Sequence, residues 1–459
     1  MFDNILLNTD SYKASHFLQY PAGADGMFSY IESRGGAWEK LVFFGLQSIL
    51  KEYLSKPITH AMVDEAVTFF AAHGEPFNEV GFRRIVDELD GFLPMRIKAA
   101  PEGMVVPTQQ VLVTIESTHP DFFWVGSYFE PLLLRVWYPA SVATQSYHMK
   151  QLIRGYLEIS CDNPVQELSF KLHDFGARGV SSTESSALGG MAHLVNFMGS
   201  DTVMGVVAAK RYYGAEMAAY SIPAAEHSTI TSWGREGEIE AYRNMLTQFA
   251  KPGSLVAVVS DSYDIFNAVE HIWGDTLRQV VIDSGATVVI RPDSGDPAAV
   301  VLKCAKLLDA RFGSTLNSKG YKVLKHVRLI QGDGINPTSL KAILDGMLAA
   351  GFSTENVAFG MGGMLLQGLN RDTLKWAMKC SAMRVHGEWR EVYKDPITDS
   401  GKRSKRGRVS LYRNTDGEFR TLATDGEIPA GFNEVLVPVW ENGRLLRDFS
   451  FDEVRANAV

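Results

Sequence analysis

The chain has 459 residues, 46% of them hydrophobic and 21% charged, which is typical of a globular protein with two or three domains. Its formal net charge of -8 argues against non-specific binding to nucleic acid or to an anionic membrane surface. The three cysteines, Cys161, Cys304 and Cys380, are too far apart for a metal motif and too few for a disulfide framework. We therefore expect a reducing, cytoplasmic compartment.

The first part of the chain, to about residue 145, predicts a mixture of helices and short strands. Residues 60–74 have the spacing of a helix, and 95–103 and 109–117 that of strands. The N-terminus lacks the basic start and apolar core of a secretory signal. The apolar stretch 121–139 contains three charged residues and two prolines, which favours buried helices over a membrane span.

The middle of the chain alternates predicted helices with short apolar runs. A helix is expected over 181–197, with Ser181 and Glu184 at capping-box spacing, and another between Pro337 and Gly351. Four runs rich in β-branched residues end in polar or glycine-rich loops, and they lie within 254–264, 286–297, 326–334 and 355–363. This order predicts an α/β fold with an irregular TIM-like (β/α) barrel, whose ligand loops follow the carboxyl ends of the strands.

The tail of the chain, from about residue 385, predicts β-structure with turns at 415–419, 424–429 and 441–445. We expect two domains. A flanking α+β domain is built from both chain ends, 1–145 together with 385–459, and the barrel domain occupies 146–384.

Three aspartates end predicted strands, namely Asp261, Asp293 and Asp333. Loops at the strand ends of a barrel meet at one mouth, so these carboxylates would repel one another. A Mg²⁺ ion relieves that repulsion and prefers oxygen ligands together with substrate phosphates. The alternative is that each aspartate only caps a loop or helix.

A glycine turn and several cations could bind phosphate groups. Residues 359–365, "FGMGGML", offer backbone N–H groups after a strand and before a helix. Arg178, Arg291, Arg371 and Lys379 also follow predicted strands or this turn. The basic run 402–408 is either a polyphosphate site or a solvated surface loop, and the acidic total disfavours a polynucleotide.

His227 is an ionisable ring among small residues and hydroxyls in "PAAEHSTITSWG". It is either a buried histidine bonded to a hydroxyl or a nucleophile, since neutral imidazole is nucleophilic near neutral pH. Glu226 or another acid could orient the ring. Phe175 and Tyr12 lie in polar, glycine-flanked segments, where each packs internally or stacks on a flat heteroaromatic ring.

The chain resembles the nicotinamide phosphoribosyltransferases, within the type II phosphoribosyltransferases. The resemblance runs nearly end to end, through "NTDSYKASHFLQYP", "HDFGARGVSS", "GSDTVMG", "PAAEHSTITSWG", "VVSDSYDI", "IRPDSGDP", "QGDG", "FGMGG", "LLQGLNRD" and "KDPITDSGKRSKRGRVSL". It implies synthesis of nicotinamide mononucleotide and pyrophosphate from nicotinamide and phosphoribosyl pyrophosphate, as a step of NAD salvage, with Mg²⁺. It also implies a homodimer with active sites at the subunit interface.

The resemblance assigns roles to individual residues. Phe175 and the partner's Tyr12 would sandwich the pyridine ring, Asp201 would accept the carboxamide NH₂, and Arg291 would lie near the same end of the base. Asp261 and Asp293 would organise the metal and the ribosyl pyrophosphate. The other implied substrate contacts are made by Arg178 (phosphate), Gly332 and Asp333 (ribose), Gly362 and Gly363 (5′-phosphate), and Arg371, Lys379, Lys394 and Lys402 (the diphosphate or ATP).

The same resemblance implies that His227 is phosphorylated by ATP and dephosphorylated during turnover. The transfer should pass through an oxocarbenium-like state, with metal and cations stabilising the leaving pyrophosphate, and a neutral pyridine needs no strong general base. Asp201 favours the amide, because two like charges at 4 Å in an effective dielectric of 20 cost about 4 kcal/mol. The chain departs from the animal members in a shorter loop after Gly36 and at Ala177 and Met364.

Three other functions remain open from the sequence. The first is a nicotinate phosphoribosyltransferase of the same fold. The second is a dimeric scaffold or binding protein that has lost catalysis. The third is an aldolase-like barrel using Lys171 as a Schiff-base lysine.

Overall fold

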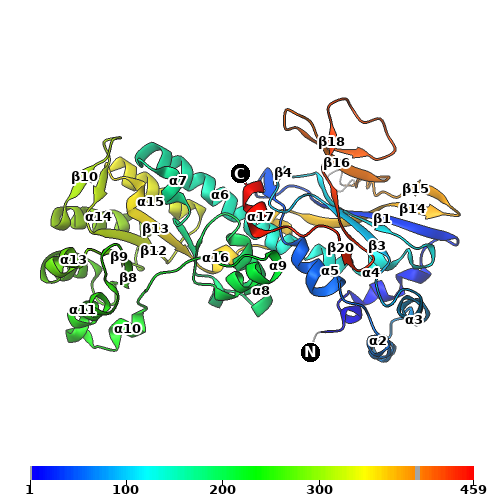
Figure 1. Ribbon diagram of the computed structural model, residues 1–459, viewed down its shortest axis with the longest axis horizontal. Coiled ribbons are helices and arrows are strands. Elements are labelled where there is room, and N and C mark those ends of the chain that lie inside the picture. The colour runs from blue at the N-terminus through cyan, green and yellow to red at the C-terminus, as the bar shows by residue number, and fades with distance from the viewer. Residues whose placement is uncertain (1–2, 399–403) are drawn as a thin grey trace. The chain divides into compact units, whose positions relative to one another are not determined.

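The structure is a computed structural model, and it describes residues 3–398 and 404–459. The chain divides into two compact units (Figure 1). The first unit contains residues 1–144, 211–215 and 370–459, and the second contains 145–210 and 216–369. The expected boundary at 384 is wrong for residues 370–384. They contain β14 (Trp376–Val385), which pairs with β1 (Ala24–Ser33) in the sheet of the first unit.

The first unit is built around a seven-stranded antiparallel sheet in the order β15-β14-β1-β5-β3-β19-β20. The strands come from both ends of the chain, because β1, β3 and β5 lie before residue 118 and the others after residue 375. The remaining bounds in this sheet are β3 (Met95–Ala99), β5 (Val111–Ser117), β15 (Glu388–Glu391), β19 (Val437–Glu441) and β20 (Arg444–Leu445).

Two small sheets and several helices complete this unit. The small sheets pair β2 (Lys40–Val42) with β4 (Val105–Pro107), and β16 (Val409–Arg413) with β17 (Phe419–Ala423) and β18 (Asn433–Glu434). The helical segments are η1 (Ile5–Leu7), η2 (Ser11–Leu18), α1 (Leu46–Ile49), η3 (Leu50–Leu54), α2 (His60–His73), α3 (Glu79–Glu88), η4 (Pro120–Phe122), α4 (Val125–Tyr128), α5 (Glu130–Leu134), η9 (Arg371–Thr373) and α17 (Phe451–Asn457). The apolar stretch from 121 thus forms short helices and the start of α6 (Trp137–Ser160), which continues into the second unit.

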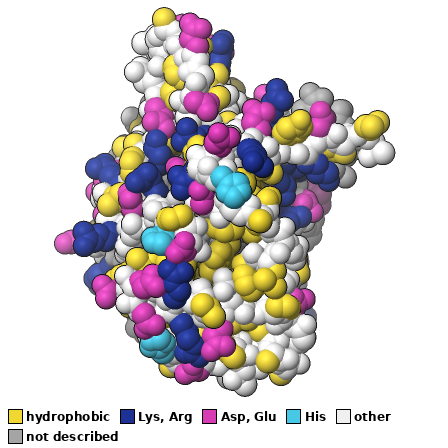
Figure 2. Space-filling view, turned by 90° about the vertical axis from the view of Figure 1, so that its right-hand side faces the viewer, with side chains coloured by type: hydrophobic (Ala, Val, Ile, Leu, Met, Phe, Trp, Pro, Cys, Tyr) yellow, Lys and Arg dark blue, Asp and Glu magenta, His cyan; other side chains and the backbone are white. Residues whose placement is uncertain are grey.

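Acidic and basic side chains are interspersed with hydrophobic ones over the face shown in Figure 2. This mixture fits the modest excess of 53 acidic over 45 basic residues in the chain. No helix within the described ranges is both long and apolar enough to cross a membrane.

The second unit contains a six-stranded parallel sheet in the order β7-β6-β13-β12-β9-β8. Its strands are β6 (Leu172–Asp174), β7 (Gly199–Ser200), β8 (Leu255–Val259), β9 (Thr287–Arg291), β12 (Val327–Gln331) and β13 (Val357–Met361). The four apolar runs predicted as strands are β8, β9, β12 and β13, and they are neighbours (Figure 1). The prediction of parallel strands is confirmed.

The barrel expectation holds only in its coarser form, as a mixed α/β fold with a parallel sheet. Between the two edge strands lies the segment 220–224, where Tyr220 forms a bridge with Gly199 of β7 and Ala224 with Ala257 of β8. Six strands and this irregular segment differ from the eight strands of a full (β/α) barrel.

Helices and a hairpin surround the parallel sheet. The hairpin pairs β10 (Ser314–Leu316) with β11 (Lys322–Leu324). The helical segments are α7 (Pro164–Leu168), η5 (Ala177–Gly179), α8 (Thr183–His193), α9 (Val203–Tyr213), α10 (His227–Thr231), η6 (Arg235–Gly237), α11 (Glu238–Phe249), α12 (Ile265–Asn267), η7 (Ala268–Thr276), α13 (Arg278–Ser284), α14 (Pro297–Phe312), α15 (Pro337–Ala349), η8 (Thr354–Asn356) and α16 (Gly363–Leu366).

The expected helix starts are half right. Pro337 is the first residue of α15, as predicted, after Asn336 as N-cap. The capping box at Ser181 is wrong, because Ser182 is the N-cap of α8 and accepts from the N–H of Ser185. The two adjacent serines offer the same cap chemistry, so only the backbone path selects between them.

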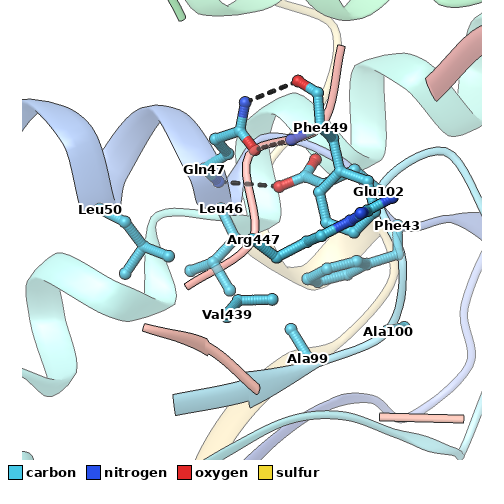
Figure 3. Close-up of a pocket in the computed structure, with 10 residues that line it drawn as sticks. All are labelled: Phe43, Leu46, Gln47, Leu50, Ala99, Ala100, Glu102, Val439, Arg447 and Phe449. Carbon is cyan, nitrogen blue, oxygen red and sulfur yellow. Dashed lines mark hydrogen bonds between the residues drawn. The ribbon is translucent and has the colours of Figure 1, made fainter. Parts of the chain in front are cut away.

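A buried carboxyl group in the first unit joins three chain segments (Figure 3). Glu102 accepts from the N–H groups of Gly45 at 2.6 Å and Gln47 at 2.7 Å, at the start of α1, and from the hydroxyl of Tyr213 at 3.1 Å. The Gln47 side chain in turn exchanges two hydrogen bonds with the backbone of Phe449. Burial raises the pKa of Glu102 to about 7.

This buried acid predicts a pH dependence of stability. Between the ordinary pKa of 4.5 and about 7, the folded state holds the Glu102 proton more tightly than the unfolded state does. The free energy of unfolding should therefore be highest below pH 4.5 with respect to this group, and fall as the pH rises through 7, by roughly 3 kcal/mol in all. Urea titrations of the full chain and of Glu102→Gln measure it, with exposed Glu39→Gln as control. If the free energy of unfolding of Glu102→Gln falls with pH as steeply as that of wild type, the assignment to Glu102 is wrong.

Candidate active site

A cavity of about 650 Å³ opens at the carboxyl ends of the parallel strands in the second unit. The loops after β6, β9, β12 and β13 contribute most of its wall, as expected for parallel α/β proteins. Ten of the predicted site residues line it together, namely Phe175, Arg178, Asp201, His227, Arg291, Asp293, Gly332, Asp333, Gly362 and Gly363. The predicted convergence of distant loops is therefore found within this unit.

His227 is the first residue of α10 and is paired with an acid. Its Nε2 atom lies 2.9 Å from Oδ1 of Asp261, and the side chains are 47% and 5% exposed, respectively. Glu226, the other acid considered from the sequence, instead accepts from the hydroxyl of Ser228. The buried carboxylate of Asp261 can only accept, so the ring proton belongs on Nε2 and Nδ1 keeps its lone pair. This arrangement excludes the interpretation of His227 as a buried core residue.

Asp293 has an unusual backbone and a crowded carboxyl group. Its φ is +47°, in the left-handed region that favours glycine. Burial raises the pKa of Asp293, and Asp261 and Asp333 raise it further against the lowering effect of Arg291 and His227. The Nε atom of Arg291 lies 3.5 Å from Oδ1 of Asp293. The charges of Asp261 and Asp333 therefore act on the Asp293 carboxyl group, as the sequence predicted.

This part of the cavity fits a cation that shares its ligands with a substrate. The described residues contain no group of three or more His, Cys, Asp or Glu side chains arranged to hold a metal ion. Asp261 and Asp293 could supply two oxygen ligands, and Mg²⁺ commonly takes its remaining ligands from water and phosphate oxygens. Burial, together with Asp261 and Asp333, raises the pKa of Asp293, and a cation bound beside it would favour the ionised form.

The glycine turn after β13 packs against the turn that carries Arg178. A Cβ atom at Gly179 would lie 2.8 Å from the Cα atom of Gly363, so the two turns touch through bare backbone. Arg178 is exposed, and with Gly362 and Gly363 it lines one side of the cavity. Ala177 and the exposed Met364, two of the three departures noted in the sequence, flank these residues.

An aromatic ring and an acid mark the other end of the cavity. The ring of Phe175 lies across Gly360, where a Cβ atom would stand only 1.9 Å from Cε2, so the close approach requires glycine. Oδ1 of Asp201 accepts from the hydroxyl of Ser221. Phe175 and Asp201 also border a second hollow of about 490 Å³ that is lined by β8, β9, β12 and β13.

Four predicted residues belong to the first unit, and a fifth lies outside the described residues. Tyr12 is 56% exposed on η2, and Arg371 and Lys394 are also exposed. Lys402 lies in 399–403, outside the described part of the chain. Lys379 is half-buried in β14. Burial lowers its pKa, and the cations Arg34, Lys13 and Arg371 lower it further against the effect of Glu130. We call Lys13, Arg34, Arg371 and Lys379 the basic cluster.

Two further residues were missed in the sequence, one in each unit. Arg34 follows β1 and contributes to the basic cluster, and its Nη2 atom is buried without a hydrogen bond in the described chain. The sequence carried no signal for it, because its neighbourhood follows from the pairing of β1 with β14, where Tyr30 lies opposite Lys379. Gln331, a fully buried amide, ends β12 beside the cavity. A polar residue at the end of an apolar run was its only signal.

Two family models match the sequence. Residues 170–427 match the model described as the Nicotinate phosphoribosyltransferase (NAPRTase) family, which is more than half of the chain. Residues 4–97 match the Nicotinamide phosphoribosyltransferase, N-terminal domain.

Similar proteins extend over the full length. The chain is 62% identical over 459 residues to a nicotinamide phosphoribosyltransferase of Xanthomonas campestris, covering 99% of this chain and 98% of that one. It is 32% identical to a nicotinamide phosphoribosyltransferase of Acinetobacter baylyi, with coverage of 98% and 96%.

Solved structures share the fold at low identity. A nicotinate-nucleotide pyrophosphorylase from Pyrococcus furiosus superposes with a TM-score of 0.66 at 14% identity, covering 100% of this chain and 95% of that one. Human nicotinic acid phosphoribosyltransferase gives a TM-score of 0.58 at 17% identity, with coverage of 98% and 92%. These likenesses support the mixed α/β fold.

Proposed function

The chain belongs to the nicotinate phosphoribosyltransferase family, as a nicotinamide-type member, and on this premise we propose that it makes nicotinamide mononucleotide and pyrophosphate for NAD salvage. The substrates are nicotinamide and phosphoribosyl pyrophosphate. The observation that carries the proposal is the joining, in one cavity, of a stacking ring, an amide acceptor, clustered carboxylates and a glycine turn. Each suits one part of these two substrates.

The base is bound at the Phe175 end of the cavity. The exposed face of the Phe175 ring stacks on the pyridine, and Asp201 accepts the carboxamide N–H. The Ser221 hydroxyl holds Asp201 in place, which limits the rotamer freedom that binding would otherwise have to restrict. Arg291, which also lines the cavity, would orient the base.

The sugar phosphate extends toward the glycine turn. Backbone N–H groups of Gly362 and Gly363, with Arg178, bind the 5′-phosphate, and Gly332 and Asp333 face the ribose. Asp261 and Asp293 would hold Mg²⁺, which when bound stabilises the leaving diphosphate. The C1–O bond breaks toward the diphosphate, which keeps the electron pair, and the pyridine nitrogen forms the new bond to C1.

His227 couples ATP hydrolysis to this transfer. Nδ1, whose lone pair is free, attacks the γ-phosphorus of ATP, and ADP leaves as the phosphorus–oxygen bond breaks. The Nε2–H donates to Asp261, which stabilises the positive charge that develops on the ring. The phosphoryl group adds ~1.5–2 negative charges beside the carboxylates and the diphosphate site. Water later hydrolyses the phosphorus–nitrogen bond, so this charge is present for part of the cycle only.

The active enzyme is a homodimer with composite sites. Tyr12 and the basic cluster belong to one unit and the base and sugar pocket to the other, and the partner's Tyr12 would complete the sandwich around the pyridine. Exposed Tyr12, Leu18 and Val203 provide apolar area for an interface. Arg371, Lys379, Lys394 and Lys402 would neutralise the diphosphate or ATP, and the buried Nη2 of Arg34 offers a further donor.

The proposed enzyme acts in the cytoplasm. All three cysteines, Cys161, Cys304 and Cys380, are free thiols, as is usual in a reducing compartment. Lys171 forms an ion pair with Glu167 and donates to the carbonyl of Glu355, so both contacts hold it in a structural position. That arrangement disfavours the aldolase-like alternative.

A product assay tests the proposal. Purified protein with phosphoribosyl pyrophosphate and Mg²⁺ should form the mononucleotide from nicotinamide, faster with ATP, and far more slowly from nicotinate. Chelation of the metal should stop product formation. A preference for nicotinate would favour the nicotinate phosphoribosyltransferase alternative, and no product from either base would favour a scaffold.

A further inference from the structure

Gln331 connects two loops of the cavity through one side chain. It is the last residue of β12 and is fully buried. Its Nε2 donates to the carbonyl oxygen of Asp293 at 3.3 Å and to that of Asp333 at 3.0 Å. The loop after β9 and the loop after β12 are therefore linked at the backbone of the two acids that line the cavity.

The backbone that Gln331 contacts is strained. Asp293 holds a left-handed φ of +47°, which is uncommon for a non-glycine residue, although aspartate adopts it more readily than most. The adjacent Ser294 N–H bonds to the carbonyl of Pro292 at 2.6 Å, in a tight turn. Gly332 gives the Asp293 carboxyl group room, since a Cβ atom there would lie 2.8 Å from Oδ1. Gln331 at the end of β12 thus holds the backbone of Asp293, and Gly332, the next residue, leaves room for its carboxyl group.

The amide is a costly choice for a buried position. Within the described residues the Oε1 atom of Gln331 is buried and has no hydrogen-bond partner, and an unsatisfied buried acceptor destabilises a fold. A methionine of similar shape would avoid that cost, so packing alone does not account for the residue.

We infer that Gln331 is a positioning residue that sets the Asp293 and Asp333 carboxyl groups for the magnesium complex of phosphoribosyl pyrophosphate, an inference that rests on the proposed function. It acts through the two backbone carbonyls and touches neither substrate. Neither Phe175 nor Asp201 takes part in these two hydrogen bonds, so binding of the base should change less than binding of the sugar phosphate.

Gln331→Met tests the inference, because it keeps the side-chain length and removes both donors. The KM for phosphoribosyl pyrophosphate, and the Mg²⁺ concentration that gives half-maximal rate, should rise about tenfold. The KM for nicotinamide should stay within about twofold. Calorimetric titration of the protein with magnesium phosphoribosyl pyrophosphate, without base, should show the same tenfold loss of affinity. Gln331→Glu, which sets a carboxylate against two carbonyls, should lose more.

Asn356→Leu is the matched control. Asn356 is also fully buried, and its Nδ2 donates to the carbonyls of Lys322 and Ser353, both at 2.8 Å, before the start of β13. This variant should lower the thermal midpoint without changing the dependence on Mg²⁺ or phosphoribosyl pyrophosphate.

The outcomes separate the two claims. If wild type makes product while both Gln331 variants keep its titration and KM values, the inference is wrong and the proposed function stands. If a variant loses as much affinity for nicotinamide as for phosphoribosyl pyrophosphate, the effect of the substitution is a general structural one, and the inference is also wrong. If wild type makes no product but binds the magnesium complex, the proposed function fails separately. If one of the two Gln331 variants does not fold, the calorimetric titration of the other variant with magnesium phosphoribosyl pyrophosphate decides whether the inference holds.

Discussion

His227→Ala is expected to abolish the stimulation of product formation by ATP, while a basal rate with phosphoribosyl pyrophosphate remains. The ring supplies the only atom in the proposal that bonds to the phosphoryl group, so its removal stops phosphoryl transfer entirely. The basal ribosyl transfer depends on Asp261, Asp293 and the glycine turn, which the substitution leaves in place. The measurement is the rate with and without ATP, together with incorporation of label from γ-labelled ATP. The label should be acid-labile and alkali-stable, as for phosphohistidine.

Matched variants separate the roles of the neighbouring groups. His227→Gln keeps an N–H where Nε2 donates to Asp261 but has no nucleophile, so it should behave like His227→Ala with a less disturbed Asp261. Asp261→Asn should slow labelling, whereas Glu226→Gln should not, since Glu226 bonds to Ser228 and not to the ring. An undiminished ATP effect in His227→Ala would remove His227 from the coupling.

Asp201→Asn is expected to raise the ratio of kcat/KM for nicotinate to that for nicotinamide by up to about a thousandfold. In wild type, a nicotinate carboxylate would face Asp201, at a cost of about 4 kcal/mol for two charges 4 Å apart in an effective dielectric of 20. Asparagine removes the charge and offers an amide N–H to the substrate carboxylate. It keeps a carbonyl acceptor for the carboxamide N–H of nicotinamide. Steady-state rates with each base measure the ratio.

Ser221→Ala is the control for this second prediction. It removes the hydroxyl that holds Asp201 and leaves the charge, so nicotinamide should bind more weakly without any gain in nicotinate use. An unchanged ratio in Asp201→Asn would show that another group selects the base, and Arg291, a cation that lines the same cavity, would then be examined by the same assay.

Hydrophobic patterning predicted the central fold with few errors. The runs that became β8, β9, β12 and β13 are short, apolar and β-branched, and strands buried on both faces require this composition. Because parallel strands place their following loops at one edge, Asp261, Asp293 and the glycine turn could be expected together before any contact was known. The motifs near His227 and Asp201 carried the resemblance that named the chemistry.

Other features depended on contacts between distant segments. The sequence offered both Glu226 and another acid as partners of His227, and only the position of β8 relative to α10 brings Asp261 to 2.9 Å from the ring. The boundary at 384 was wrong because β14 is apolar like the strands before it, and its assignment follows from pairing with β1, some 350 residues earlier. Arg34 and Gln331 have no motif of their own, and their importance follows from what lies opposite them.

The amino-acid sequence by itself determined the kinds of element, their order and the chemical groups at their ends, because burial imposes a local period on apolar residues. Tertiary structure alone decided which nitrogen of His227 is free, how Asp293 is held, and that the parallel sheet has six strands bridged by 220–224. Those features arise from contacts between residues far apart in the chain. Such contacts depend on strand order and on the path of the backbone, which no local pattern encodes.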